Sequence, residues 1–235
     1  EDGLKLFKEF VSVADVVVDN LSQGVTNRLG IDHQSLKKVN PKIITCSISG
    51  FGDTEVNRPA YDNLIQGYAG AMSITGTDKE NPVKSGIPIA DLGAGLYAVI
   101  GILSAIQSRE KNDSGEHVDI SMLDTQVSLL TYMATMHFLS GENPEPIGNQ
   151  HMNHVPFNSY RTSDGFIQIG VVAEDFWPSL IEALDLRQLD TEENKVRIGR
   201  LKNRENIDEA LQEVFITNTT EPVSYTHLTL PTTHC

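Results

Sequence analysis

The chain has 235 residues, of which 39% are hydrophobic, and its formal net charge at pH 7 is −14. This length allows one large domain or two small ones, and the composition allows a packed core. A surface for nucleic acid or for an anionic membrane needs clustered Lys and Arg, so the acidic balance argues against both partners. It leaves room for a local basic pocket that binds a phosphorylated ligand.

The first fifty residues predict the last part of an open α/β sheet. We expect a helix over 4–11, a strand over 14–20, a helix over 34–39 and a strand over 42–49. Both strands are continuous apolar runs, which is typical of parallel strands buried on both faces. Because parallel neighbours need right-handed crossovers, the pattern predicts a Rossmann-like sheet. The chain opens directly into a helical pattern at Glu1, so we expect an N-terminal part to be missing and the sheet to be incomplete.

The next segment predicts long helices around one more strand. Residues 61–71 form a helical pattern rich in small residues, and Asp91 opens a long apolar helix that runs to about Gln107. Residues 117–122 alternate as a strand does, and 123–139 are helical again. The longest uncharged run, 92–108, is rich in Gly, and we expect it to fall short of a membrane span.

A second, smaller domain is expected from about residue 150. Two strands, 157–161 and 166–170, flank Asp164-Gly165, which is a strong hairpin turn signal. A helix over 176–184 and a charged helical stretch over 190–215 follow. The predicted fold class is therefore α/β, with an incomplete Rossmann-like parallel sheet and long helices in 1–149 and a smaller α+β domain in 150–222.

The last segment, 223–235, differs in texture from everything before it. It matches the translation of a sequencing adapter over its whole length, so we expect the natural sequence to stop near Pro222 and exclude the tail from the fold. The chain has two cysteines, Cys46 in an apolar run and Cys235 in this tail. Too few cysteines are present for a disulfide framework, which favours a reducing compartment, and we expect a cytoplasmic protein.

Eight short segments keep a common order and spacing between about residues 4 and 206. They lie at 14–20, 28–30, 40–44, 47–52, 61–66, 86–95, 115–122 and 148–151. Together they resemble the class III CoA-transferase family, which includes formyl-CoA, carnitine and succinyl-CoA–dicarboxylate CoA-transferases and shares its fold with alpha-methylacyl-CoA racemases. No single segment is diagnostic, but eight in register are specific. The resemblance implies that coenzyme A and acyl-CoA are substrates, with no tightly bound cofactor, and that the full-length protein forms an interlocked homodimer.

Asp91 stands where the aspartate nucleophile of this family stands. The resemblance implies that Asp91 attacks an acyl thioester to form a mixed anhydride, which the released CoA thiolate then converts to an aspartyl-CoA thioester. An Asp directly before Leu92-Gly93-Ala94-Gly95 occupies an N-cap position, where free helix N–H groups would keep it ionised. Gly93 would let a thioester approach the backbone closely and would offer an amide to an oxyanion. A plain helix cap is the alternative reading of Asp91.

Tyr61 and Asp62 occupy the place of a Tyr–acid pair in transferases. The resemblance implies that Asp62 orients the substrate or bonds near Asp91. Racemases carry a His where Tyr61 stands, because they need a base for the α-proton, so Tyr61 favours transfer. Taken singly, each residue is also compatible with a half-buried aromatic or with a cap.

Four residues match positions that contact CoA in relatives: Asn20, Leu21, Arg28 and Leu29. Arg28 suits a phosphate, although a surface Arg without a ligand is the competing interpretation. Leu21 stands where many relatives have Phe, so we expect a weaker stacking contact with adenine. At 148–151, the single Gly148 makes a glycine-rich lid doubtful, and we expect His151 to be structural.

CoA transfer between carboxylic acids is the leading hypothesis. The alternatives are an acyl-CoA racemase or epimerase and a CoA-binding relative without catalysis. The histidines show no metal-ligand spacing, so we expect no metal site. Part of the CoA pocket is expected in the missing N-terminal part, so we expect this chain to be inactive alone and its full-length parent to be active.

Overall fold

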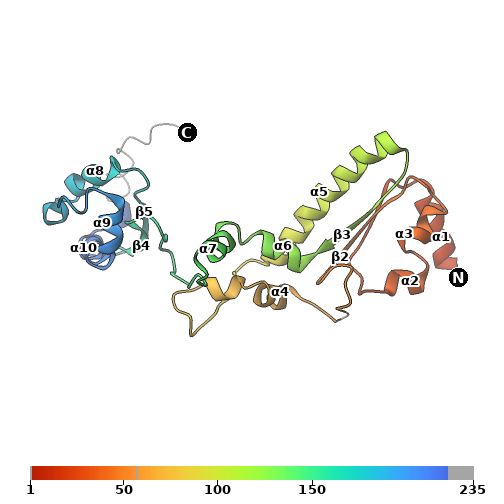
Figure 1. Cartoon of the computed structure of the whole chain (residues 1–235), viewed down its shortest axis with the longest axis horizontal. Coiled ribbons are helices and arrows are strands. Elements are labelled where there is room, and N and C mark those ends of the chain that lie inside the picture. The colour runs from red at the N-terminus through yellow and green to blue at the C-terminus, as the bar shows by residue number, and fades with distance from the viewer. Residues whose placement is uncertain (1, 57, 222–235) are drawn as a thin grey trace. The chain divides into compact units, whose positions relative to one another are not determined.

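The computed structural model describes residues 2–56 and 58–221 and divides the chain into two compact units (Figure 1). The first unit ends at Pro146 and the second begins at Ile147. The expected boundary between residues 149 and 150 lies close to this division. The segment 223–235, for which we expected a foreign origin, lies outside the described residues.

The first unit combines parallel strands with helices. Its elements are α1 (Asp2–Val11), β1 (Val16–Asp19), α2 (Val25–Leu29), α3 (His33–Lys37), β2 (Ile44–Ser49), α4 (Asp62–Tyr68), the 3₁₀ turn η1 (Ala71–Ile74), α5 (Ile89–Asn112), β3 (His117–Ser121), α6 (Met122–Ser128) and α7 (Tyr132–Ser140). The strand order is β1-β2-β3, and both pairs are parallel. The predicted α/β class and the parallel sheet are therefore confirmed.

The strands of this sheet differ in burial. Ile44 and Cys46 of the central strand β2 are fully buried, in line with a strand covered on both faces. Val18 of β1 is 53% exposed, so the expectation that this strand is buried throughout is wrong. Among the described residues β1 pairs with β2 alone, which makes it an edge strand with one neighbour.

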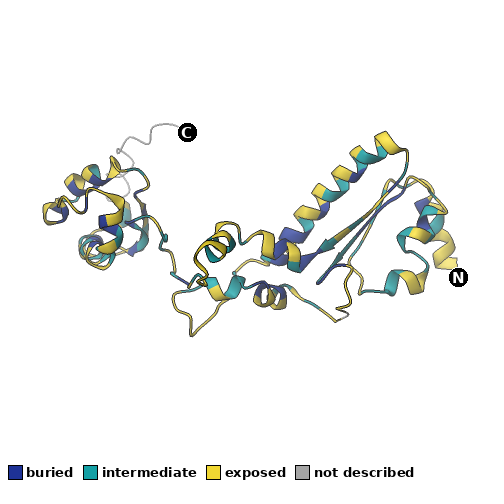
Figure 2. Ribbon diagram, in the orientation of Figure 1, coloured by how far each residue is buried: buried dark blue, intermediate teal, exposed yellow. Residues whose placement is uncertain are grey.

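Helix α5 packs along the sheet through its small side chains, and Figure 2 colours its residues by burial. The buried residues of α5 are Ala90, Gly93, Ala94, Ala98 and Ala105. At Gly101, an added Cβ would lie 2.6 Å from Val118 Cγ1 of β3, so the close approach of helix and strand requires glycine there. Small residues on one face thus place α5 directly on the strands.

The opposite face of α5 is apolar and exposed. Its exposed side chains are Leu92, Leu96, Val99, Ile100 and Leu103. Helix α5 has 24 residues, and an 18-residue window within it has a mean hydropathy of 1.9, so α5 is long and apolar enough to cross a membrane by length and composition, contrary to our expectation for 92–108. One such helix is weak evidence for a span, and the packing of α5 on β2 and β3 is that of a core helix of an α/β unit.

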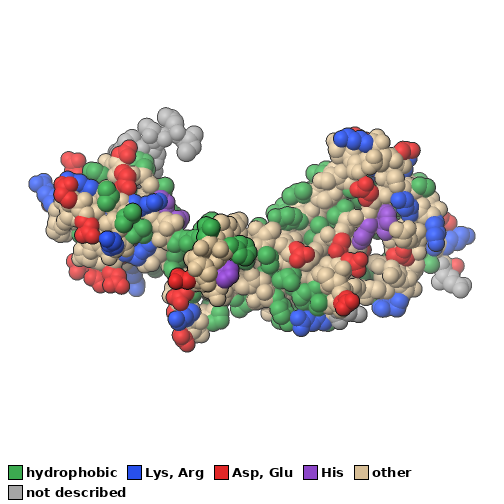
Figure 3. Space-filling model, in the orientation of Figure 1, with side chains coloured by type: hydrophobic (Ala, Val, Ile, Leu, Met, Phe, Trp, Pro, Cys, Tyr) green, Lys and Arg blue, Asp and Glu red, His purple; other side chains and the backbone are tan. Residues whose placement is uncertain are grey.

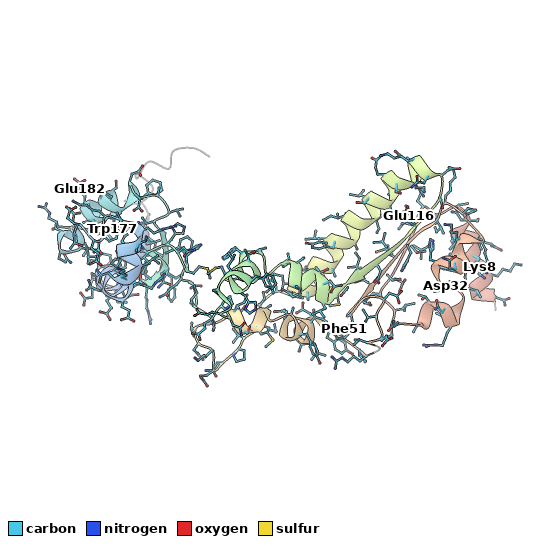
Figure 4. The ribbon with its side chains drawn as sticks, in the orientation of Figure 1. Lys8, Asp32, Phe51, Glu116, Trp177 and Glu182 are labelled. Atoms are coloured by element: carbon cyan, nitrogen blue, oxygen red, sulfur yellow. The ribbon has the colours of Figure 1, made fainter. Side chains whose placement is uncertain are left out.

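The second unit is a small α+β structure. An antiparallel hairpin, β4 (Phe157–Arg161) and β5 (Phe166–Gly170), is followed by α8 (Phe176–Ala183), the 3₁₀ turn η2 (Arg187–Leu189), α9 (Arg197–Lys202) and α10 (Arg204–Ile216). Helix α10 buries Ile207, Leu211 and Phe215 at a spacing of four residues. Trp177 points into the same core (Figure 4). The hairpin and the charged helices with one buried face match the prediction for this segment.

Candidate active site

The first residues of α4 and α5 meet at one point. Asp62 begins α4, and its Oδ1 accepts hydrogen bonds from the backbone N–H groups of Ala90, at 2.8 Å, and Asp91, at 3.3 Å. A small core of Phe51, Ile65, Ala90, Ala94 and Met122 lies beneath this meeting point and fixes the two helix ends against each other. The structure therefore brings Asp62 to Asp91, which lies 29 positions further along the chain.

Asp91 is not the N-cap that the sequence suggested. Helix α5 begins two residues earlier, at Ile89, so Asp91 lies inside the first turn. The N–H groups of Ala90 and Asp91 bond to Asp62, and those of Ile89 and Leu92 bond to the carbonyls just before the helix. Asp62 thus caps α5 from a different helix, and it receives the favourable interaction with the helix N-terminus that we had expected for Asp91.

This exchange of roles reverses the expected electrostatics of the nucleophile candidate. Partial desolvation raises the pKa of the Asp91 carboxyl, and the charge of Asp62 raises this pKa further. Both causes disfavour the ionised form of Asp91. A carboxylate formed there is less stabilised than one in water and is correspondingly more reactive toward an electrophile.

Gly93 packs against a neighbouring helix, and its expected contact with a ligand stays a prediction. It is buried, and an added Cβ would lie 3.0 Å from Thr125 Cγ2 and 3.1 Å from Leu129 Cδ1, next to α6. Because Gly93 follows the first turn, its N–H belongs to the hydrogen-bond ladder of the helix. The geometry therefore gives no support to a backbone oxyanion donor at Gly93. Gly95 differs, because nothing lies within 4 Å of its added Cβ.

A cavity of about 400 Å³ opens beside Tyr61, where the chain leaves β1 and β2. Tyr61 precedes α4, and its side chain is 69% exposed. Asn20 and Leu21, which follow β1, line the same cavity. The Asn20 amide donates to the carbonyl of Ile48 at 2.6 Å and so ties the ends of β1 and β2 together. Three of the predicted site residues thus share one cavity.

Two other predicted CoA contacts are not brought to this cavity. Arg28 and Leu29 lie on the short helix α2, are exposed, and are absent from the residues that line the cavity. Their predicted contact with CoA stays a prediction.

Arg58 is a lining residue that the sequence reading missed. Its guanidinium carbon lies 5.2 Å from the centroid of the Phe51 ring and 4.7 Å from that of Tyr68. Cation–π contacts with these two rings hold the Arg58 guanidinium in place. Figure 4 labels Phe51. Among the described residues that line this cavity, Arg58 alone carries a charge. The only sequence signal was its position three residues before Tyr61, in a loop without a periodic pattern.

Comparison with known proteins identifies the family. The model of CoA-transferase family III matches residues 1–226. The chain belongs to CoA-transferase family III. Its sequence is 34% identical over 204 residues to the succinate–glutarate CoA-transferase of Agrobacterium fabrum, covering 84% of this chain and 51% of that protein. It is 31% identical over 216 residues to the human succinyl-CoA:glutarate CoA-transferase, covering 91% of this chain and 49% of that protein.

A solved structure confirms the fold of this family III chain. The crystal structure of a CAIB/BAIF family protein from Brucella suis has a TM-score of 0.88 and 32% identity, and the match covers 98% of this chain and 62% of that structure. The chain spans about half the length of the curated relatives it matches.

The family III chain carries a second, polar cavity of about 540 Å³ over one face of the sheet. Thr45 Oγ1 lies 2.9 Å from His33 Nδ1 and 2.8 Å from His117 Nδ1. Figure 3 shows histidine side chains at a hollow of this unit. Desolvation lowers the pKa of His33, and His117 lowers it further. Tyr61, Asp62 and Asp91 do not line this cavity, but Leu21 lines both cavities, so the two adjoin.

In the second unit, the predicted connection 148–151 has local structural partners. The Asn149 amide donates to Ser159 Oγ at 3.0 Å, and His151 Nδ1 accepts from the backbone N–H of Asn153 at 3.0 Å. These bonds agree with a structural role for His151.

Proposed function

We propose that this chain is part of an enzyme that moves CoA from an acyl-CoA donor to a carboxylic acid acceptor, with Asp91 as covalent nucleophile. The contact between Asp62 and the first turn of α5 carries the proposal, because it places a carboxylate of raised pKa at an exposed helix start. Family membership supports coenzyme A thioesters as substrates. Covalent catalysis by a carboxylate splits one difficult transfer into easier steps.

The proposed reaction needs no net proton. The Asp91 carboxylate attacks the thioester carbonyl, the carbon–sulfur bond breaks, and a mixed anhydride and CoA thiolate form. The thiolate attacks the Asp91 carbonyl of the anhydride, which releases the donor acid as a carboxylate and leaves an aspartyl-CoA thioester. The acceptor carboxylate then displaces the thiolate to give a second anhydride. The thiolate attacks the carbonyl carbon that the acceptor acid contributed to this anhydride, which yields the new acyl-CoA and regenerates the Asp91 carboxylate.

Each of the other residues has a proposed part in this reaction. Asp62 holds the start of α5 and keeps Asp91 in place, and Tyr61 faces the cavity next to this point. Asn20 and Leu21 contact CoA within the cavity. Arg28 and Leu29, exposed on α2, are proposed to contact the outer part of the same ligand.

A dicarboxylic acid is the proposed substrate class. The names of the two curated relatives refer to succinate and glutarate, which are dicarboxylic acids, and to succinyl-CoA, which is the CoA thioester of succinate. The uncompensated charge of Arg58 in the cavity supports an anionic ligand there.

The proposed active form is a full-length, cytoplasmic, interlocked homodimer. The exposed apolar face of α5 supports a further protein surface against it, since contiguous exposed apolar residues mark association sites. Sedimentation of the full-length protein should show a dimer, and a monomer at assay concentration would refute it. The buried, free thiol of Cys46 agrees with a reducing compartment. We propose that the present chain is inactive by itself.

Substitution of the nucleophile tests the proposal. The full-length protein with Asp91→Asn should lose at least ~1000-fold in the rate of CoA transfer from succinyl-CoA to glutarate, because a neutral amide is a far weaker nucleophile than a carboxylate. Asp124→Asn is the matched control, since Asp124 is also an exposed acid in the first turn of a helix. Full transfer by Asp91→Asn would refute the proposal. Exchange of the α-hydrogen of an acyl-CoA for deuterium without transfer would show a racemase instead.

A further inference from the structure

A buried glutamine of α4, Gln66, bonds both to the start of its own helix and to the loop that precedes α5. Gln66 lies in the middle of α4 with 1% of its surface exposed. Its Nε2 donates to Asp62 Oδ2 at 2.6 Å, and its Oε1 accepts from the backbone N–H of Ser85 at 2.8 Å. A buried amide costs free energy unless it is hydrogen-bonded, and here both ends of the amide have partners.

The bonds of Gln66 define which way the Asp62 carboxylate faces. Residues four apart lie on the same face of a helix, so Gln66 reaches Asp62 from one turn away. With Oδ2 held by Gln66, the other oxygen, Oδ1, is directed at the N–H groups of Ala90 and Asp91. Loss of the Gln66 bond would let the Asp62 carboxylate rotate away from α5.

Gln66 also fixes the segment that leads into α5. Ser85 lies in the loop before this helix, and its N–H bonds to the side chain of Gln66. The path from Ser85 to Asp91 is therefore held on α4 at both ends, by Gln66 at one end and by Asp62 at the other. A single side chain thus links the loop, the cap and the candidate nucleophile.

We propose that Gln66 is a positioning residue for Asp91, acting through the Asp62 carboxylate and the Ser85 backbone; this rests on the proposed function. Gln66 touches no reacting atom. It sets the direction of the Asp62 carboxylate, and Asp62 sets the position and the electrostatic environment of Asp91. Displacement of a catalytic group by about 1 Å can reduce a rate by about 100-fold.

Two substitutions separate positioning from simple filling of the core. Gln66→Leu fills most of the volume of the glutamine side chain but removes both of its hydrogen bonds. Gln66→Glu keeps the shape, but the new carboxyl group must carry a proton to donate to Asp62. Gln126→Leu is the matched control, because Gln126 is 3% exposed on the neighbouring helix α6 and its Oε1 has no partner among the described residues.

The first readout is the titration of Asp91 in the 235-residue chain, followed by NMR of ¹³C-labelled aspartate carboxyls and assigned with Asp91→Asn. Gln66→Leu should move the Asp91 midpoint down part of the way toward the ordinary Asp value, because desolvation of Asp91 remains but the Asp62 charge is no longer held beside it. Gln126→Leu should leave the midpoint in place. An unchanged midpoint in a folded Gln66→Leu chain would overturn the inference, whether or not the protein transfers CoA.

The second readout is the kinetics of the full-length protein. Gln66→Leu should lower kcat by about 10-fold to 100-fold with little change in the KM for acyl-CoA. Relative to wild type at the same pH, Gln66→Glu should be least impaired at low pH and should lose activity as pH rises and the introduced carboxyl group ionises against Asp62. If the wild type is active and Gln66→Leu is equally active, the positioning role of Gln66 is refuted while the proposed function stands. An inactive wild type would refute the proposed function and leave the NMR result to decide on Gln66.

Discussion

At the scale of single residues, two acids that look alike in sequence have different electrostatic environments. Asp62 accepts hydrogen bonds from N–H groups of Gln66, Ala90 and Asp91, whereas Asp91 lacks the cap bonds that we expected for it. The sequence placed both acids in the site, yet the motif around Asp91 led to the wrong conclusion about which one caps α5. The exchange depends on a contact between separate helices, which no local pattern contains.

The raised pKa of Asp91 predicts the pH dependence of catalysis. Below this pKa the carboxyl is protonated and cannot attack, so kcat/KM should fall at a higher pH than for an ordinary aspartate. Asp62→Asn removes the neighbouring charge and should move the acidic limb of the pH profile, where kcat/KM falls, to lower pH. The pH profile of transfer by the full-length protein measures it, with Asp124→Asn as control. A limb that stays in place in Asp62→Asn would contradict the assigned coupling.

The same shift fixes the sign of a stability effect. A group whose pKa is raised by folding stabilises the protein below its unfolded pKa, and this contribution is lost as pH rises through the folded pKa. Asp91→Asn should therefore make the chain more stable than wild type at neutral pH, as measured by urea unfolding. The two proteins should become alike in acid, and a wild type that is the more stable one at neutral pH would contradict the raised pKa.

Arg58 should recognise an anionic part of the ligand. Arg58→Met keeps an apolar chain against Phe51 and Tyr68 but removes the charge, and we expect the KM for acyl-CoA or for the acid to rise about tenfold. A rise for coenzyme A but not for dephospho-coenzyme A would assign the 3′-phosphate, and a rise for dicarboxylic but not monocarboxylic acids would assign the acid. Arg187→Met is the control, because Arg187 is exposed and belongs to the other unit. Unchanged KM values for every substrate would contradict the anion site.

At the scale of elements, the glycines of α5 have distinct reasons. Gly101 lies against Val118, Gly93 lies against α6, and Gly95 faces open space. The sequence predicted the helix, but it could not name the packing partner of each glycine, because that partner depends on tertiary structure. Helix periodicity states which residues share a face and leaves open what that face touches.

These environments predict opposite effects of one substitution. Gly95→Ala should stabilise the chain by about 0.5–1 kcal/mol, because alanine is the better helix former and no atom obstructs it. Gly101→Ala should destabilise it by about 1–3 kcal/mol, because the new methyl group collides with β3. Urea unfolding followed by far-UV circular dichroism measures both. Equal effects of the two substitutions would show that the α5–β3 packing is wrong.

At the scale of the whole molecule, the sequence predicted the order and pairing of the elements better than it predicted which of their surfaces are exposed. The alternation of apolar strands and helices correctly indicated parallel pairing, and Asp164-Gly165 correctly indicated the hairpin. The exposed edge at Val18 and the exposed apolar face of α5 were not foreseen, since both depend on which surfaces find a partner. The chain spans about half of its curated relatives, and its proposed activity belongs to the full-length protein.

The central claim is that the Asp91 carboxyl becomes covalently acylated by a CoA thioester. The most direct measurement incubates the full-length protein with succinyl-CoA and hydroxylamine and locates the modified residue by peptide mass spectrometry. An anhydride or thioester at Asp91 is captured as a hydroxamate on that side chain, and the account predicts this product only when succinyl-CoA is present. CoA transfer that proceeds at its full rate with Asp91 unmodified, or a hydroxamate on another acid, would contradict it.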